Sequence, residues 1–195
     1  MPRRRITFAK GSYYHIYNRG AGRQAIVREE RNYHHILRLL GAVAAESEVT
    51  VIAYCLLPNH YHWLLRQDGE IAVGNVPQRV FGSYSQAFNK AYRRTGTLFE
   101  GTFKAILVDS EAYLAALCRY IHNNPVKHGL VGIPEAWPFS NYLEWIERRS
   151  GSLFDRQVTH GSFLSAAEYV EVVRASLPGR SMASPDLPLY LGELE

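Results

Sequence analysis

The stretch Ala53-Tyr54-Cys55-Leu56-Leu57-Pro58-Asn59-His60-Tyr61-His62-Trp63-Leu64-Leu65 decides the fold, because two apolar runs meet in it at a turn. Residues 49–57 are rich in apolar and β-branched side chains, which predicts a buried strand. Pro58-Asn59 is typical of a tight turn, and residues 60–66 then predict an antiparallel partner strand. We therefore expect two neighbouring strands of one sheet here.

The segments on either side predict two more strands and three long helices. The expected elements are strands over 12–18 and 103–108 and helices over 29–46, 75–94 and 111 to about 124. This order predicts an α+β fold with a ferredoxin-like (βαββαβ) antiparallel sheet and one added C-terminal helix. Pro125 discourages that added helix from continuing. Further on we expect a short helix to about Arg149, a weaker helical pattern over 150–178 and then an extended tail.

Composition narrows the class of protein. The chain has 195 residues, of which 47% are hydrophobic, so it suits one globular domain with a small appendage. No apolar run approaches the roughly 18 residues of a membrane span, and no long apolar segment follows the basic N-terminus as a secretory signal would require. Cys55 and Cys118 lie in apolar stretches and are interpreted as reduced core residues of a cytoplasmic protein.

The net charge of +4 conceals an asymmetry along the chain. Residues 1–130 carry 17 lysines and arginines against 9 acidic residues, a balance of +8. Residues 131–195 carry 5 against 9, a balance of −4. The basic part favours a polyanionic partner, for which nucleic acid is the default, although an ordinary basic surface is an equal alternative on charge alone.

His60 and His62 are the first candidate functional residues. Side chains alternate along a strand, so both histidines share one face with Leu64, whereas Tyr61 and Trp63 share the other. Their Cα atoms would lie roughly 6.5–7 Å apart, which lets both rings converge on one ion. Two neutral imidazoles leave positions open for water and a substrate oxygen, as a catalytic metal requires. An isolated pair of this kind more often consists of surface or hydrogen-bonded histidines.

The second candidate segment is Arg119-Tyr120-Ile121-His122-Asn123-Asn124-Pro125, at the end of the added helix. Tyr120 and Asn124 are one turn apart on the flank of the apolar stripe, so they are neighbours. A phenol has a pKa of about 10 and needs assistance to act as a nucleophile, which a nearby metal would supply. Asn124 would be able to give that metal an oxygen ligand. Taken alone, a tyrosine in this position is more often a packing residue.

Four blocks of sequence together resemble one family. The strand 53–65 resembles the metal-binding strand of the HUH single-tyrosine transposases, and more narrowly the chain is similar to their REP-associated branch. Tyr14-His15-Ile16-Tyr17-Asn18-Arg19-Gly20 resembles the family's first strand. The blocks 96–105 and 119–126 resemble the stretch before the fourth strand and the helix of the catalytic tyrosine. The one departure is Tyr61, where the family usually has a bulky aliphatic residue between the histidines.

The resemblance implies a role for each matching residue. His60 and His62 bind a divalent metal, Mg²⁺ or Mn²⁺, Tyr120 is the nucleophile, and Asn124 is the third metal ligand or its close support. Residues 1–149 form the transposase domain, with the catalytic tyrosine on the added helix, and residues 150–195 form a helical or extended appendage.

The resemblance also implies a reaction and a substrate. Tyr120 attacks a phosphate of single-stranded DNA and leaves a 5′-phosphotyrosine and a free 3′-hydroxyl, from which strands are later rejoined. The implied DNA folds into hairpins of repetitive extragenic palindromes (REP). A monomer is expected, with a homodimer possible. The candidate DNA contacts are basic residues that could equally be solvated surface charges: Arg3, Arg4, Arg5, Arg19, Arg23, Lys104 and Lys127.

Three other functions compete with this interpretation. A non-catalytic module that binds DNA or RNA hairpins would need neither the histidines nor Tyr120. An RNA-binding ferredoxin-like protein would carry exposed aromatic residues on its central strands, where this chain has His60 and His62. A zinc hydrolase would require a third strong ligand near the pair, for which His15 is the one candidate.

Overall fold

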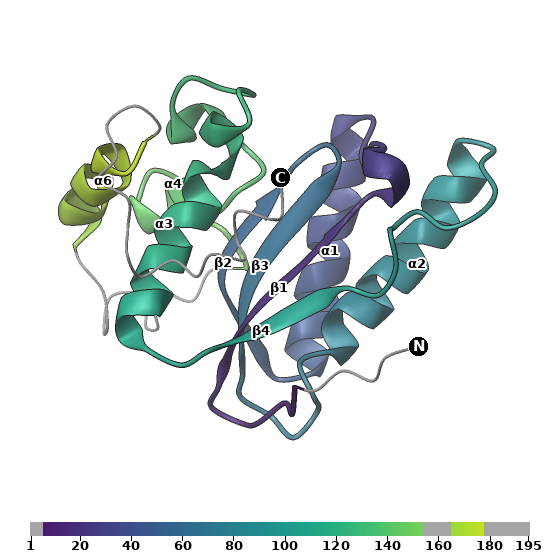
Figure 1. The fold of residues 1–195 in the computed structure, drawn as a ribbon, viewed down its shortest axis with the longest axis horizontal. Helices are drawn as coiled ribbons and strands as arrows, with labels where there is room; N and C mark the ends of the chain where they lie inside the picture. Colours follow the sequence, from purple (N-terminus) through teal and green to yellow (C-terminus); the bar gives the residue numbers. More distant parts are fainter. Residues whose placement is uncertain (1–5, 154–164, 178–195) are drawn as a thin grey trace.

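A four-stranded antiparallel sheet separates two layers of helices in the computed structural model, which describes residues 6–153 and 165–177 (Figure 1). The strand order is β2-β3-β1-β4, and each neighbouring pair is antiparallel. This arrangement confirms the expected ferredoxin-like sheet. The strands are β1 (Tyr13–Arg19), β2 (Val49–Leu56), β3 (His60–Gln67) and β4 (Lys104–Val108).

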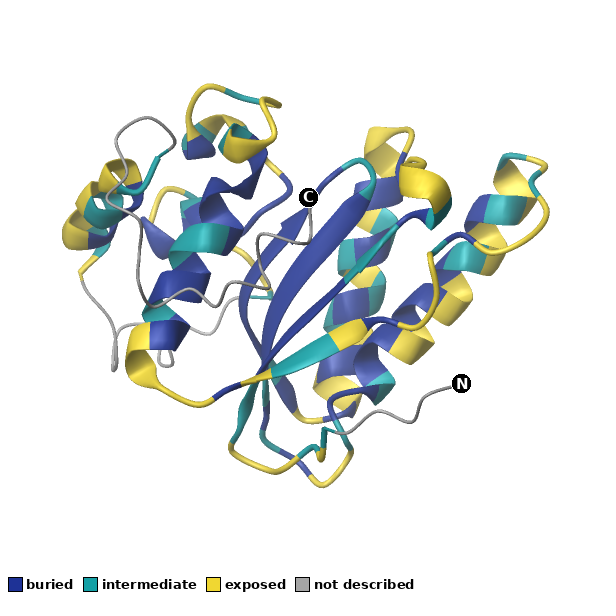
Figure 2. Ribbon diagram, in the orientation of Figure 1, coloured by how far each residue is buried: buried dark blue, intermediate teal, exposed yellow. Residues whose placement is uncertain are grey.

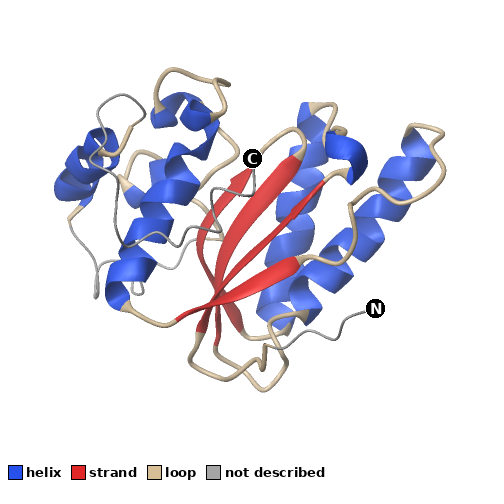
Figure 3. Cartoon of the chain, viewed as in Figure 1, coloured by secondary structure: helices blue, strands red, loops and turns tan. Residues whose placement is uncertain are grey.

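Helices lie on both faces of the sheet (Figure 3). On one face lie α1 (Glu30–Glu46) and α2 (Asn75–Ala91). On the other lies α3 (Glu111–Lys127), with α4 (Tyr142–Trp145) and α6 (Ala166–Ala175) beyond it. Two short 3₁₀ helices, η1 (Ala21–Arg23) and η2 (Pro134–Ala136), lie in connections. No helix in the described part of the chain combines the length and hydrophobicity of a membrane span.

Alternation along β3 divides the interior into two cores. Tyr61 and Trp63 pack into the core under α1 and α2, whereas Leu64 packs into the core under α3. The central strands are therefore buried on both faces (Figure 2). Cys55 and Cys118 are buried free cysteines of the second core, as expected. The face predicted for His60 and His62 is thus the one that α3 covers.

The end of α3 differs from the prediction. The helix does not stop before Pro125 but continues to Lys127. A Schellman motif ends it: the backbone N–H of Leu130 donates to the carbonyl of Pro125 at 2.9 Å, and that of Gly129 donates to Val126 at 2.9 Å. Gly129 has the positive φ of 67° that this ending requires. The prediction was wrong because it weighed the proline and not the glycine four residues later.

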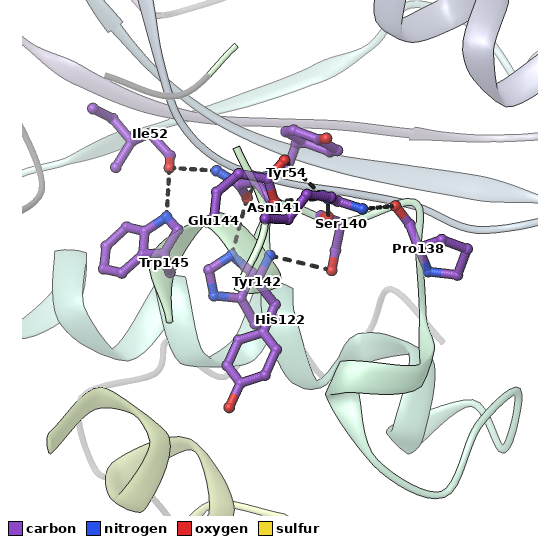
Figure 4. Close-up of polar contacts among 10 residues, drawn as sticks. Ile52, Tyr54, His122, Pro138, Ser140, Asn141, Tyr142, Glu144 and Trp145 are labelled. Atoms are coloured by element: carbon purple, nitrogen blue, oxygen red, sulfur yellow. Dashed lines mark hydrogen bonds and ion pairs between the residues drawn. The ribbon is translucent and has the colours of Figure 1, made fainter. Parts of the chain in front are cut away.

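The segment after η2 protects the edge of the sheet at β2 (Figure 4). Asn141 imitates a neighbouring strand: its Oδ1 accepts from the backbone N–H of Tyr54 at 2.8 Å, and its Nδ2 donates to the carbonyl of Ile52 at 2.9 Å. Here a helix was expected to reach about Arg149, but α4 ends at Trp145. Arg149 instead turns back and binds both carboxylate oxygens of Glu144 at 2.9 and 2.7 Å.

The helix α6 completes the second core. Tyr169 and Val173 are buried, and the phenol oxygen of Tyr169 lies 2.6 Å from Nδ1 of His122 in α3. The helical pattern expected within 150–178 is thus present over part of its length. The tail expected from Pro178 lies outside the described residues, and the division of the chain at residue 149 stays a prediction.

Candidate metal and nucleic-acid site

His60 and His62 begin β3, directly after the turn at Pro58-Asn59. Their rings are 5.3 Å apart between centroids and lie at 88° to each other. Only 8% and 2% of the two residues is exposed, so both lie under α3. Burial holds the pKa of His62 well below its usual value, and neighbouring histidines lower this pKa further. His62 is therefore a neutral imidazole with a lone pair to offer.

Asn124 meets the pair from α3. Its Oδ1 lies 3.2 Å from Nε2 of His60, while Nδ1 of His60 lies 2.7 Å from Oδ1 of Asn59. A neutral imidazole has one N–H, so when Asn59 takes it, Nε2 of His60 and the amide oxygen of Asn124 are two electron-rich atoms facing each other. The buried Nδ2 of Asn124 has no hydrogen-bond partner among the described residues. Two imidazole nitrogens and an amide oxygen fit a divalent cation such as Mg²⁺ or Mn²⁺.

Tyr120 lies beside this pair. Its ring meets that of His62 edge to face, with centroids 5.4 Å apart. The side chain is half-buried, so part of it is accessible from outside the core. Nζ of Lys127 lies 5.2 Å from the centre of the Tyr120 ring. The structure therefore brings Tyr120, Asn124 and Lys127 of α3 to one place with the two histidines of β3.

A small cavity opens in front of the histidines. Its volume is about 150 Å³. It lies at one end of the sheet, where the end of β1, the start of β3 and the segment leading into β4 meet. Tyr17 pairs with His62 across the strands on one side and with Lys104 on the other. The lining residues are Tyr17, Asn18, Arg19, His60, His62, Glu100, Thr102 and Lys104.

The predicted DNA contacts fall into different places. Arg19 and Lys104 line the cavity, but Arg19 is also paired with Glu100 at 2.9 Å, which offsets its charge. Arg23 lies in η1, where its carbonyl accepts from the side chain of Asn59 at 3.4 Å, and it does not line the cavity. Lys127 is beside Tyr120. The remaining three, Arg3, Arg4 and Arg5, lie outside the described residues.

Sequence reasoning did not assign three neighbours of the pair correctly. Nε2 of His15 lies 3.0 Å from Nδ1 of His62, and burial lowers the pKa of His15 to about 3. From the sequence, His15 was proposed only as a zinc ligand. Its position two residues before Tyr17 puts both side chains on the same face of β1, and this spacing could have indicated that His15 lies near His62. The ring of His128 meets that of His60 edge to face, with centroids 4.7 Å apart. This contact was not expected, because α3 was predicted to end before His128. Asn59 was read only as a turn residue.

The zinc alternative required a third strong ligand beside the pair. Within residues 6–153 and 165–177, no three histidine, cysteine or carboxylate side chains gather as a metal-ligand group. His15 is bonded to His62 rather than standing beside it as an equal ligand. The oxygen atom that α3 brings to His60 is the amide oxygen of Asn124.

Comparison with known proteins assigns the family. Residues 9–124 match the family described as IS200-like transposases, and this match spans more than half of the chain. The chain belongs to this transposase family. The four blocks that resembled the family in the sequence, and the fold expected from them, agree with this assignment. The match ends at Asn124, so the last turn of α3 and α6 lie beyond it.

Two proteins are similar to this transposase. A protein of Haemophilus influenzae that is named as a REP-associated tyrosine transposase is 31% identical over 102 residues, which are 47% of this chain and 57% of the relative. The transposase thus spans little more than half the length of that relative. A structure described as a REP-associated tyrosine transposase bound to a REP hairpin has a TM-score of 0.65 and 19% identity, and covers 82% of this chain and 94% of its own. This second likeness supports the fold.

Proposed function

We propose that this transposase is a metal-dependent endonuclease and strand transferase of single-stranded DNA, with Tyr120 as its nucleophile. The observation that carries the proposal is the contact between Tyr120 of α3 and His62 of β3, with ring centroids 5.4 Å apart. α3 packs on the face of the sheet that carries His62, so the fold brings together two residues that are far apart in the sequence. Their meeting puts a nucleophile beside two imidazoles, of which that of His62 is neutral.

His60, His62 and the amide oxygen of Asn124 would hold the metal. A bound Mg²⁺ or Mn²⁺ supplies positive charge that binds a phosphate oxygen and stabilises the transition state. Asn59 keeps His60 oriented through the 2.7 Å contact to its Nδ1. Asn124 brings its amide oxygen from the α3 side to 3.2 Å from Nε2 of His60. The chain's own contribution here is a rigid donor set built on a strand and a helix.

Tyr120 performs the covalent step. Its phenol oxygen forms a bond to the phosphorus and loses its proton, while the bond from phosphorus to the 3′-oxygen breaks and that oxygen takes up a proton. The products are a 5′-phosphotyrosine and a free 3′-hydroxyl. The energy of the broken bond is kept in the protein–DNA link, so attack by a 3′-hydroxyl rejoins strands without ATP. Nζ of Lys127 lies 5.2 Å from the centre of this ring, so a positive charge stands beside the proposed nucleophile.

The proposed substrate is single-stranded DNA that folds into hairpins of REP type. Both relatives described above carry the name of the REP-associated branch, and the solved one is bound to a REP hairpin. The cavity in front of the histidines has Arg19 and Lys104 in its wall, and these cations suit a phosphate backbone. We further infer a monomer that works in the cytoplasm, where the buried free thiols Cys55 and Cys118 would stay reduced.

A denaturing gel tests the proposal directly. Purified protein is mixed with end-labelled single-stranded DNA from the flanks of its own gene, with Mn²⁺ or with EDTA. Wild type is expected to give a covalent adduct in Mn²⁺ only. Tyr120→Phe removes the nucleophilic oxygen and His60→Ala removes a metal ligand, so each should lower adduct formation by at least about a hundredfold.

Tyr113→Phe is the matched control, because Tyr113 lies on the same helix two turns before Tyr120 and is buried in the second core. It should form the adduct at nearly the wild-type rate. Tight hairpin binding by all the variants, with no adduct from wild type, would overturn the proposal for these substrates. The non-catalytic hairpin-binding function would then be preferred.

A further inference from the structure

We propose that His15 is a positioning residue that accepts the Nδ1–H of His62 and so directs the Nε2 lone pair of His62 to the metal. The inference rests on the proposed function, in which His62 is a metal ligand. It adds a residue that is neither a ligand nor in the wall of the cavity. Its role is exerted through His62 alone.

The geometry links the two rings closely. His15 lies on β1 and pairs with Leu64 across to β3, so its side chain is diagonal to His62 on the same face of the sheet. Nε2 of His15 and Nδ1 of His62 are 3.0 Å apart, and the rings are stacked at 19° with centroids 5.2 Å apart. His15 is fully buried and His62 is 2% exposed, so water does not compete for this bond.

Through this bond, the nitrogen that carries the proton in one ring determines which nitrogen carries it in the other. A neutral imidazole has one donor nitrogen and one acceptor nitrogen. If His15 donates from Nε2, then His62 accepts at Nδ1 and carries its own proton on Nε2, where it cannot bind a metal. If His15 accepts at Nε2, then His62 keeps its proton on Nδ1 and presents the lone pair of Nε2. Only this second arrangement is compatible with a metal at His62.

Packing alone does not account for a histidine at this position. Nδ1 of His15 is buried and has no hydrogen-bond partner among the described residues. A buried nitrogen without a partner is unfavourable in either tautomer, and an apolar side chain would avoid that cost. Within the described part of the chain, the bond to His62 is the polar contact that offsets this cost. The polar ring is therefore explained by what it does to His62.

Tyr17 holds the two rings in place. Its ring centroid is 4.8 Å from that of His15 and 5.9 Å from that of His62, so it contacts both from the cavity side. Contact with the Tyr17 ring opposes the 180° turn that would replace Nδ1 of His62 by a carbon atom. The orientation of His62 is thus set before any metal arrives, which is the general function of the outer partners of metal-bound histidines.

Two variants and two measurements test the inference. His15→Leu removes the acceptor, and His15→Gln keeps a polar terminus near the position of Nε2. Mn²⁺ affinity, measured by calorimetry on the full chain without DNA, should fall about 10–100-fold in His15→Leu and recover most of that loss in His15→Gln. Nitrogen NMR of the histidine rings at saturating Mg²⁺ should find the proton of His62 on Nδ1 and Nε2 of His15 unprotonated.

A proton on Nε2 of His15 in the Mg²⁺-bound protein would overturn the inference, as would unchanged Mn²⁺ affinity in His15→Leu. If His15→Leu unfolds, His15→Gln and the wild-type NMR spectrum still decide. The variant His62→Ala separates this inference from the proposed function. If His62→Ala binds Mn²⁺ as wild type does, the proposed metal site itself is wrong; if it loses Mn²⁺ while His15→Leu does not, only the role of His15 is wrong.

Discussion

Asn123 and Asn124 are adjacent in α3, and their side chains leave the helix in different directions. Asn123 donates from Nδ2 to the carbonyl of Val173 at 3.0 Å and to Oγ of Ser176 at 2.9 Å, and so connects α3 to the end of α6. Asn124 turns its oxygen to His60. Neighbouring helical positions are about 100° apart, so one amide serves the second core and the other serves the site.

Exchanging each of these amides for leucine separates the two roles. Asn124→Leu removes the proposed oxygen ligand with little change in volume, so Mn²⁺ affinity should fall by at least about tenfold. Asn123→Leu leaves the carbonyl of Val173 without this donor, so the free energy of unfolding should fall by about 1–3 kcal/mol while Mn²⁺ affinity stays constant. Calorimetric titration and urea denaturation measure the two effects. Wild-type Mn²⁺ affinity in Asn124→Leu would exclude Asn124 as a ligand.

The last turn of α3 determines which side chains reach the site. Tyr120, Asn124 and Lys127 follow one another at helical spacing, and Lys127 is the final residue of the helix. A helix that stopped at Asn124 would not hold Lys127 on the same face as Tyr120, nor place His128 against His60 at 4.7 Å. The Schellman ending at Gly129 is therefore part of the scaffold of the site.

Gly129→Ala tests this ending. Gly129 has a φ of 67°, and a Cβ there would meet nothing within 4 Å, so the substitution adds backbone strain and no clash. The free energy of unfolding should fall by about 1–2 kcal/mol. Gly132→Ala is the control, since a Cβ there also meets nothing within 4 Å and Gly132 is not among the positive-φ glycines. Equal losses in both variants, measured by urea denaturation, would show that the left-handed conformation is not what matters.

The elements could be predicted where a pattern repeats along the chain, and they were misjudged where the structure depends on distant contacts. The two core faces of β3 follow from alternation alone, and the sheet order followed from the order of elements. The length of α4 was overestimated, because Arg149 turns back to bind Glu144 and does not continue the helix. His15 was not recognised as a partner of His62, because their 3.0 Å contact depends on the diagonal between two strands 47 residues apart.

The basic and the acidic parts of the chain contain different elements of the fold. The basic part of the chain, residues 1–130, contains the entire sheet and carries a balance of +8, whereas residues 131–195 carry −4. Lys104 and Arg19 line the cavity at one end of β1. Lys10 precedes the other end of β1 and is paired with Glu70 at 3.0 Å. A DNA strand that enters at the histidines would pass close to Lys104 and far from Lys10.

Salt dependence of binding distinguishes this local effect from one of net charge. Lys104→Gln and Lys10→Gln each remove one positive charge, so an effect of net charge alone would be equal in both. If Lys104 neutralises one phosphate, the slope of log affinity against log salt concentration should become shallower by about 0.7 in Lys104→Gln, the value for a single-stranded ligand. The slope should stay at the wild-type value in Lys10→Gln. Fluorescence anisotropy with a labelled single strand, using Tyr120→Phe as the background to prevent covalent capture, measures both slopes.

Equal slopes in the two variants would mean that the strand does not pass Lys104, and its path would have to be sought on the Lys127 side of Tyr120 instead.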